Sequence, residues 1–313
     1  MKILMVSAHF NLPDDAIPLG GVQKHISEIT KEFSSRGYRV DWCYPGQAKK
    51  EISIIKPDLI IAHDFVSFVP DVSMPQITVF HGWEGRVPPD EAVIKRRLEV
   101  EKLSSATIAV GDYIRRWYKQ SPSLVIYGGV DSSIAYVPTL RKGGLFYNGE
   151  RRLLYVGRLA PDCSPHIFFR ALKKTRNVFT LDICGDGPLR KDLERTANEL
   201  GIEVEFHGFT EDVNSHIRVA DIVLTSGYLS ILESYINKRP VISVYDNSLK
   251  EDYLKLMPCS PFVCGTSFEV SEKLDFIWEK GIGELKDINY QFALGNSWSR
   301  VVDKYEELIR KIT

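Results

Sequence analysis

The 313-residue sequence lacks the features that would place it in a membrane or on nucleic acid. No apolar run approaches the ~18–20 residues that a membrane-spanning helix needs. Forty lysines and arginines face 41 acidic residues, and the formal net charge is −1. Because no overall field favours a polyanion, we expect no nucleic-acid partner.

Cysteine is also scarce, with five residues at positions 43, 163, 184, 259 and 264. An odd, scattered set is typical of reduced thiols in a cytosol. Cys259 and Cys264 form a C-x4-C pair, but no second pair stands at zinc-site spacing, so we expect no metal. The N-terminal MKILMVSAHF is too short an apolar run for a signal peptide and predicts a core strand. The expected location is cytoplasmic.

What the sequence does contain is a regular alternation of short, β-rich apolar runs with amphipathic stretches. In the first part the runs are 3–7, 38–44, 58–63, 76–81, 106–111 and 124–127. In the second part they are 152–157, 179–185, 204–208, 221–226 and 240–245. Near-continuous apolar strands separated by helices predict parallel sheets with both faces covered.

The segment 138–150, PTLRKGGLFYNGE, interrupts this alternation and has the composition of a linker. We therefore predict an α/β fold with two Rossmann-like, doubly wound domains, 1–140 and 141–295. Ligands bind at the carboxyl ends of the strands in such sheets, so the strand-end loops should face a shared cleft. Apolar or aromatic residues at 298, 301, 302, 305, 308 and 312 predict an amphipathic helix in 296–313, packing back on the N-terminal domain.

Several strand-end loops carry residues suited to binding an anion. Gly20 and Gly21 precede the first helix, where they allow close backbone approach or simply form a flexible turn. Arg158 follows the first strand of the second domain, where a guanidinium can hold a diphosphate or be an ordinary surface charge. Asp186, in CGDGPL, either caps a helix or contacts a ligand.

Glu233 lies in LTSGYLSILESYINKRPVI, near the start of an expected helix. Ser230 and Glu233 fit a capping box. Alternatively, Glu233 accepts hydrogen bonds from vicinal hydroxyls such as those of a ribose, while the N–H groups of Tyr228 to Ser230 bind a phosphate. Spacing alone leaves both open.

Two histidines end strands in the first half of the chain. A histidine at the end of a strand is often only a hydrogen-bonded residue at the edge of the core, and His63 fits that description. His81, followed by Gly and Trp, is the better candidate for binding or polarising a substrate hydroxyl.

Taken in order, these segments resemble a family-4 (group 1) retaining glycosyltransferase of GT-B architecture. The resemblance rests on GGVQKHISEITKEFSSRGYRV, VFHG, YGGVD, YVGRLAPD, ICGDGPL, VEFHGFTEDV, ADIVLTSGYLSILESYINKRPVI and the closing SWSRV helix. It implies a hexosyltransferase-like enzyme (EC 2.4) that uses a nucleotide-diphosphate sugar and needs no cofactor or metal.

The resemblance also assigns roles to residues of this sequence. Arg158 would hold the donor diphosphate, Glu233 the ribose, and His81 the transferred sugar. The amides of Tyr228, Leu229 and Ser230 would contact phosphates, and Gly20 and Gly21 would approach the diphosphate. Residues 206–209, among them Phe206, Gly208 and Phe209, would flank the base.

Two positions depart from the family pattern. The Glu expected eight positions before Glu233 is Thr225, and the Lys expected five positions after Arg158 is Cys163. Loss of a buried, phosphate-paired cation would cost on the order of 2–5 kcal/mol unless another replaces it. Lys24, Arg141 and Lys142 are the candidates for that replacement.

The acceptor is a glycan or a lipid-linked glycan by the same resemblance. VIKRRLEVEKL (93–103) and YIRRWYKQ (113–120) crowd seven lysines and arginines among apolar residues. Such helices either contact an anionic membrane at its cytosolic face or are solvated. Because Thr225 and Cys163 depart from the pattern, a non-catalytic nucleotide-sugar or carbohydrate-binding partner subunit stays open, as does nucleotide-sugar epimerisation.

Overall fold

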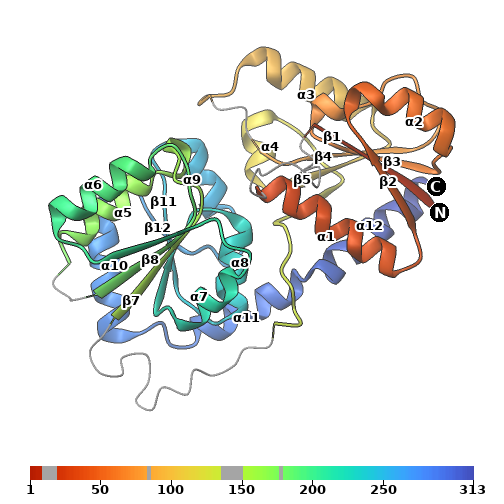
Figure 1. The fold of residues 1–313 in the computed structure, drawn as a ribbon. Coiled ribbons are helices and arrows are strands. Elements are labelled where there is room, and N and C mark those ends of the chain that lie inside the picture. The colour runs from red at the N-terminus through yellow and green to blue at the C-terminus, as the bar shows by residue number, and fades with distance from the viewer. Residues whose placement is uncertain (9–19, 83–85, 135–150, 176–178) are drawn as a thin grey trace. The chain divides into compact units, whose positions relative to one another are not determined.

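A computed structural model describes residues 1–8, 20–82, 86–134, 151–175 and 179–313 of the protein. The chain divides into two compact units, which are described separately. Unit 1 comprises residues 1–129 and 297–313, and unit 2 comprises residues 130–296 (Figure 1). The linker expected near residue 140, with Arg141 and Lys142, lies outside the described residues.

Unit 1 is built on a six-stranded parallel sheet of order β2-β1-β3-β4-β5-β6. The strands are β1 Lys2–Ser7, β2 Arg39–Cys43, β3 Leu59–His63, β4 Gln76–Phe80, β5 Ala106–Val110 and β6 Leu124–Ile126. The helices are α1 Gly21–Ser35, α2 Ala48–Ile55, α3 Glu91–Leu103, α4 Tyr113–Tyr118 and α12 Trp298–Ile312, with short 3-10 helices at Pro45–Gln47 and Phe65–Ser67. The central strands β3, β4 and β5 are buried throughout, as expected for a sheet covered on both faces.

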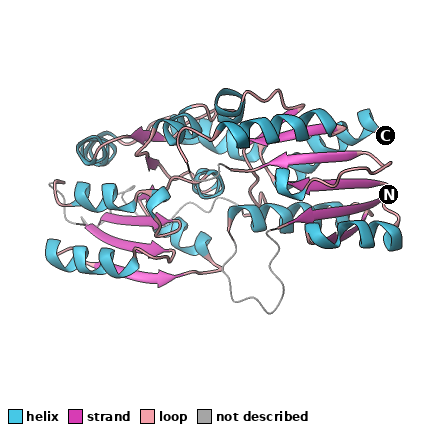
Figure 2. Ribbon diagram, turned by 90° about the horizontal axis from the view of Figure 1, so that it is seen from above, coloured by secondary structure: helices cyan, strands magenta, loops and turns pink. Residues whose placement is uncertain are grey.

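The C-terminal helix α12 packs against α1 and closes unit 1, so the two chain termini lie close together (Figures 1 and 2). Arg36, at the end of α1, forms ion pairs with Asp303 at 2.8 Å and with Glu306 at 3.0 Å. Buried Tyr305 donates or accepts a hydrogen bond with His25 Nε2 at 3.1 Å. Contacts of both kinds fix the amphipathic helix on the unit that begins the chain.

Unit 2 contains a second six-stranded parallel sheet, of order β12-β11-β10-β7-β8-β9. The strands are β7 Arg151–Val156, β8 Phe179–Cys184, β9 Val204–Gly208, β10 Ile222–Leu224, β11 Val241–Val244 and β12 Phe262–Cys264. The helices are α5 Pro165–Leu172, α6 Arg190–Leu200, α7 Val213–Val219, α8 Tyr228–Ile236, α9 Ser248–Lys255, α10 Ser267–Lys280 and α11 Leu285–Gly295, with a 3-10 helix at Pro161–Cys163.

The predicted pair of Rossmann-like, doubly wound domains is confirmed. The strand that the sequence analysis missed is β12, whose three residues follow Pro261 and give no long apolar run. In each sheet the strand order reverses at one point, between β1 and β3 in unit 1 and between β7 and β10 in unit 2. Loops at the carboxyl ends of these strands form the ligand-binding positions of open α/β sheets.

Candidate functional site

In unit 2, Arg158 and α8 extend from the two strands that flank the reversal point. Arg158 comes two residues after β7, and α8 follows the paired strand β10 after a three-residue turn. Both therefore start from the carboxyl edge of the sheet. This is the edge at which the sequence analysis places a diphosphate.

The Arg158 side chain is 58% exposed, and its guanidinium donates to Asp162 at 2.5 Å. Burial alone would lower the pKa of Arg158, but the nearby Cys163 and Asp162 outweigh it and raise that pKa. The buried Tyr155 hydroxyl donates to the Arg158 carbonyl at 2.9 Å, which fixes the backbone beneath the side chain. Arg158 is thus an anchored, half-exposed cation whose carboxylate partner an anionic ligand could replace.

The loop after β8 lies directly against the loop that carries Arg158. Leu159 N donates to Asp186 O at 2.9 Å, and a Cβ atom on Gly185 would lie 1.9 Å from Gly157 O. Asp186 accepts from Gly187 N at 2.7 Å and pairs with Arg190 at 2.8 Å, and these contacts lower its pKa. It does not cap α6, because Leu189 occupies the cap position.

The N-terminus of α8 is held by hydroxyl groups. Gly227 is the N-cap, and the Tyr228 amide donates to Tyr253 Oη at 3.0 Å. Ser230 Oγ lies 2.6 Å from Thr225 Oγ1. Thr225 is buried, so the position where the resemblance expects a carboxylate is filled by a hydroxyl that braces α8. A phosphate at the Tyr228 amide would have to displace the Tyr253 hydroxyl.

The capping-box alternative for Glu233 is wrong. Helix α8 begins at Tyr228, so Ser230 is already inside the first turn and no side chain caps the helix. A capping box at Ser230 would start the helix at residue 231, three residues after its actual start. Glu233 itself is buried on α8, with 7% of its surface exposed, and its ribose-binding role stays a prediction.

Phe206, Gly208 and Phe209, the predicted base-flanking residues, lie at the end of β9. Phe206 packs under the Arg190 guanidinium, 5.6 Å from the ring centroid. Gly208 has φ +68°, which glycine adopts readily, and the Phe209 ring is 51% exposed. An exposed aromatic ring beside a glycine turn is a suitable stacking surface for a base.

Sequence reasoning missed Lys250, in the first turn of α9. Its Nζ donates to Ser226 O, in the turn before α8, at 2.6 Å and lies 4.2 Å from the centroid of the Tyr253 ring. Only 5% of Lys250 is exposed. Burial lowers its pKa to about 8, while Cys163 and Asp162 raise that pKa and Arg158 lowers it. These couplings place the ammonium in the Arg158 environment, although no local sequence pattern links the two residues.

Unit 1 gathers three buried histidines where its strands end. His63 Nδ1 lies 2.9 Å from His81 Nε2, and the His25 ring centroid lies 5.0 Å from that of His81. His25 belongs to α1, which Gly20 and Gly21 introduce. The His81 amide donates to Asp64 Oδ1 at 2.9 Å. The predicted sugar-binding His81 is therefore a positioned residue, while the roles of Gly20 and Gly21 stay predictions.

His25 makes the stability of unit 1 depend on pH. Burial, with a contribution from His81, lowers the His25 pKa well below 6.5. The unfolded chain then binds more protons below that pH, so stability falls as the pH drops. We expect a loss of about 1.4 kcal/mol between about pH 7.5 and about pH 5.5 from this group. Urea unfolding of wild type and His25→Gln measures it, and an equal pH dependence in both proteins would contradict it.

The two basic helices do not expose all of their lysines and arginines to solvent. Arg97 in α3 is fully buried, stacked 3.8 Å over the Tyr118 ring and bonded to Gln120 at 3.1 Å. Ile94, Leu98, Lys95 and Lys102 line a shallow groove on α3. One of the seven cations thus serves the core of unit 1.

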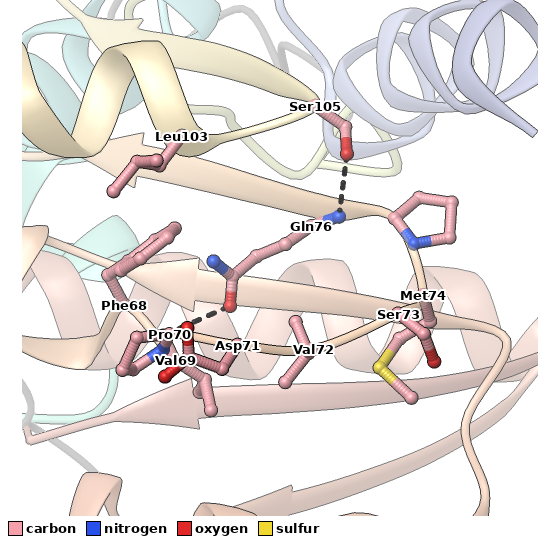
Figure 3. Close-up of a pocket in the computed structure, with 11 residues that line it drawn as sticks. Phe68, Val69, Pro70, Asp71, Val72, Ser73, Met74, Gln76, Leu103 and Ser105 are labelled. Carbon is pink, nitrogen blue, oxygen red and sulfur yellow. Dashed lines mark hydrogen bonds between the residues drawn. The ribbon is translucent and has the colours of Figure 1, made fainter.

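Two further features are a hollow in unit 1 and a group of possible metal ligands in unit 2. A hollow of about 400 Å³ adjoins the N-terminal edge of β4 and β5, where Gln76 accepts from Val69 N at 3.1 Å (Figure 3). Within the described residues, one group could hold a metal ion: Asp182, His207 and His216, whose ligand atoms lie within 4.8 Å of one another. His207 and Asp182 already share a hydrogen bond at 2.6 Å. A metal-free reaction stays a prediction.

Comparison with known proteins finds similarity to glycosyltransferases. Residues 150–252 match the family model of Glycosyl transferases group 1. A Campylobacter jejuni GalNAc-alpha-(1->4)-GalNAc-alpha-(1->3)-diNAcBac-PP-undecaprenol alpha-1,4-N-acetyl-D-galactosaminyltransferase is 27% identical over 162 residues. That match covers 48% of this chain and 43% of the relative, so the chain spans less than half of the relative's length.

Solved structures match over the whole chain. Anabaena HepE in complex with UDP and glucose has a TM-score of 0.75 at 17% identity, covering 99% of this chain and all of that one. WaaG, a glycosyltransferase involved in lipopolysaccharide biosynthesis, has a TM-score of 0.69 at 14% identity, covering 98% and 99%. The fold is GT-B.

Among the described residues, every helix is too short or too polar to span a membrane.

Proposed function

We propose that this chain, whose second unit carries the group 1 glycosyl transferase pattern within a GT-B fold, transfers a sugar from a nucleotide-diphosphate donor to a glycan or lipid-linked acceptor. The observation that carries the proposal is the match over 150–252, which contains Arg158, α8 and Lys250. Arg158 and α8 start from the carboxyl edge of the unit 2 sheet at its reversal point, and Lys250 contacts the turn before α8.

The chemistry follows from the charges present. When the bond between the anomeric carbon and the diphosphate breaks, negative charge develops on the leaving phosphate, and a guanidinium and helix amides stabilise it. The acceptor hydroxyl oxygen forms the new bond to the anomeric carbon, and its proton passes to the departing phosphate oxygen. We propose retention of configuration without a covalent enzyme intermediate, metal ion or other cofactor, with His81 contacting the transferred sugar and Glu233 the ribose.

We further propose a lipid-linked acceptor at the cytosolic face of a membrane. The name of the Campylobacter jejuni relative includes a PP-undecaprenol acceptor. The groove on α3 is lined by three lysines and two glutamates beside Ile94 and Leu98. Its lysines outnumber its carboxylates, and cations beside apolar side chains suit an anionic lipid surface.

A donor panel tests the proposal. UDP-, GDP-, ADP- and TDP-sugars are added to the protein, and stability is followed by thermal unfolding. One donor at a hundred times its Kd should stabilise the fold by about 2.7 kcal/mol. With that donor and lipid-linked or free glycans, NMR of the product should show consumption of donor and an unchanged anomeric configuration, faster in anionic than in neutral vesicles.

The outcomes separate the alternatives. Binding without turnover on any acceptor would indicate a nucleotide-sugar-binding partner subunit, an alternative that the hydroxyl at Thr225 favours. A free sugar epimer would indicate epimerisation. Binding of no nucleotide sugar would contradict the proposed function outright.

A further inference from the structure

Lys250 is a buried cation at the point where ligands bind to open α/β sheets. Its ammonium group donates to Ser226 O at 2.6 Å, in the turn that joins β10 to α8. The carboxyl end of β10 flanks the reversal point of the sheet. A lysine is rarely buried to this extent unless anions or dipoles compensate its charge.

The surroundings of Lys250 are built to hold its side chain in place. Tyr253 lies under the ammonium and stacks on Tyr228, with ring centroids 3.9 Å apart and planes 8° from parallel. The Tyr253 hydroxyl accepts from the Tyr228 amide at 3.0 Å, and Tyr228 Oη donates to the Tyr253 carbonyl at 2.6 Å. The Lys250 amide is capped by Asn247 at 2.8 Å. The lysine, the aromatic pair and the start of α8 therefore form one rigid group.

Several titratable groups face this ammonium. Cys163 and Asp162 come from the 3-10 helix after β7, Arg158 from the loop before it, and Asp246 from the end of β11. Cys163 feels the reciprocal effect, since Lys250 and Arg158 both lower the pKa of its thiol against the larger effect of burial. Lys250 and Arg158 thus both lie close enough to Cys163 for their charges to act on its thiol.

We infer that Lys250 is a diphosphate-binding residue, which pairs from α9 with the phosphates that Arg158 holds from the β7 loop. This rests on the proposed function. Lys250 would also supply the cation that the family pattern has at the position of Cys163. It stands 87 positions further along the chain, on α9. Lys24, on α1 of unit 1, is not needed for this role.

The change in protonation state of Lys250 makes the inference measurable. With a pKa of about 8, free Lys250 loses its charge as the pH rises through that value. A bound diphosphate favours the charged form, so it raises the pKa and the complex takes up a proton. Affinity for the diphosphate should therefore fall above about pH 8, with proton uptake on binding in that range.

The experiment compares wild type, Lys250→Met and Lys255→Met. Lys255 is a matched control, because it lies on the same helix, is 52% exposed and pairs with Glu251 at 2.6 Å. UDP, GDP, ADP and TDP are titrated calorimetrically at about pH 7 and about pH 8.5, in two buffers of different ionisation enthalpy. The nucleoside without phosphates is titrated in parallel.

Lys250→Met should weaken nucleoside diphosphate binding about 30- to 300-fold and abolish proton uptake, while Lys255→Met changes neither. Binding of the nucleoside should stay within about threefold in both variants. Wild-type protein that binds the diphosphate at about pH 8.5 without taking up a proton contradicts the inference, whether or not Lys250→Met folds. A wild type that binds no nucleoside diphosphate contradicts the proposed function instead.

Discussion

Arg158→Ala should lower kcat/KM for the nucleotide sugar by about 30- to 1,000-fold, equivalent to about 2–4 kcal/mol. The guanidinium is anchored through its backbone by Tyr155 and faces Asp162, which a diphosphate would replace. Within the described residues, its removal would leave the phosphate charge to Lys250, as we propose, and to the amides of α8. Steady-state kinetics with varied donor, together with the thermal shift produced by the donor, measure the loss.

Arg195→Ala is the matched control, because Arg195 is 69% exposed on α6 and pairs with Asp192 at 3.0 Å. Its kinetics should equal those of wild type. Arg158→Lys keeps the charge but loses the planar fork, so an intermediate loss of about tenfold is expected. Unchanged kinetics in a folded Arg158→Ala protein would remove Arg158 from the site.

Gly185→Ala should destabilise unit 2 by about 3 kcal/mol or more, the largest stability effect that we expect from one added methyl group. The new Cβ would lie 1.9 Å from Gly157 O, a backbone atom that cannot move alone. Gly157 N is bonded to Cys184 O at 3.2 Å, so separating the two loops breaks the contact that supports Arg158. Calorimetric unfolding and donor titration should therefore show lower stability and weaker donor binding together.

Gly295→Ala serves as the control for this prediction, because Gly295 is the last residue of α11 and no atom lies within 4 Å of an added Cβ. Alanine there favours the helix and should be neutral or slightly stabilising. If Gly185→Ala unfolds like wild type, the close approach of the two loops is not a feature of the folded protein.

Much of the fold follows from the sequence because parallel strands covered on both faces are largely apolar along their length. Leu59–His63 and Gln76–Phe80, which are buried at every position, illustrate this. The three residues Phe262–Cys264 form an edge strand, so little of their sequence has to be apolar and no run marks them. The error at Ser230 has a similar origin, since Gly227 caps α8 through its backbone conformation alone.

The candidate site was predicted where its residues follow strands, as Arg158 and His81 do. Lys250 was not, because its importance depends on how α9 packs against the β10–α8 turn, and that packing joins residues distant in sequence. His25 was missed for the same reason. On α1 it occupies an ordinary position of the inward face, and only the folded unit brings it to His81 and Tyr305.

Helix α12 completes unit 1 although unit 2 precedes it in the chain, which has a consequence during biosynthesis. Translation delivers every residue of 130–296 before α12 leaves the ribosome, so unit 2 can mature while unit 1 still exposes the α1 surface that α12 covers. Residues 1–129 of the nascent polypeptide should then expose this apolar surface, and favour chaperone binding, until residues 297–313 emerge.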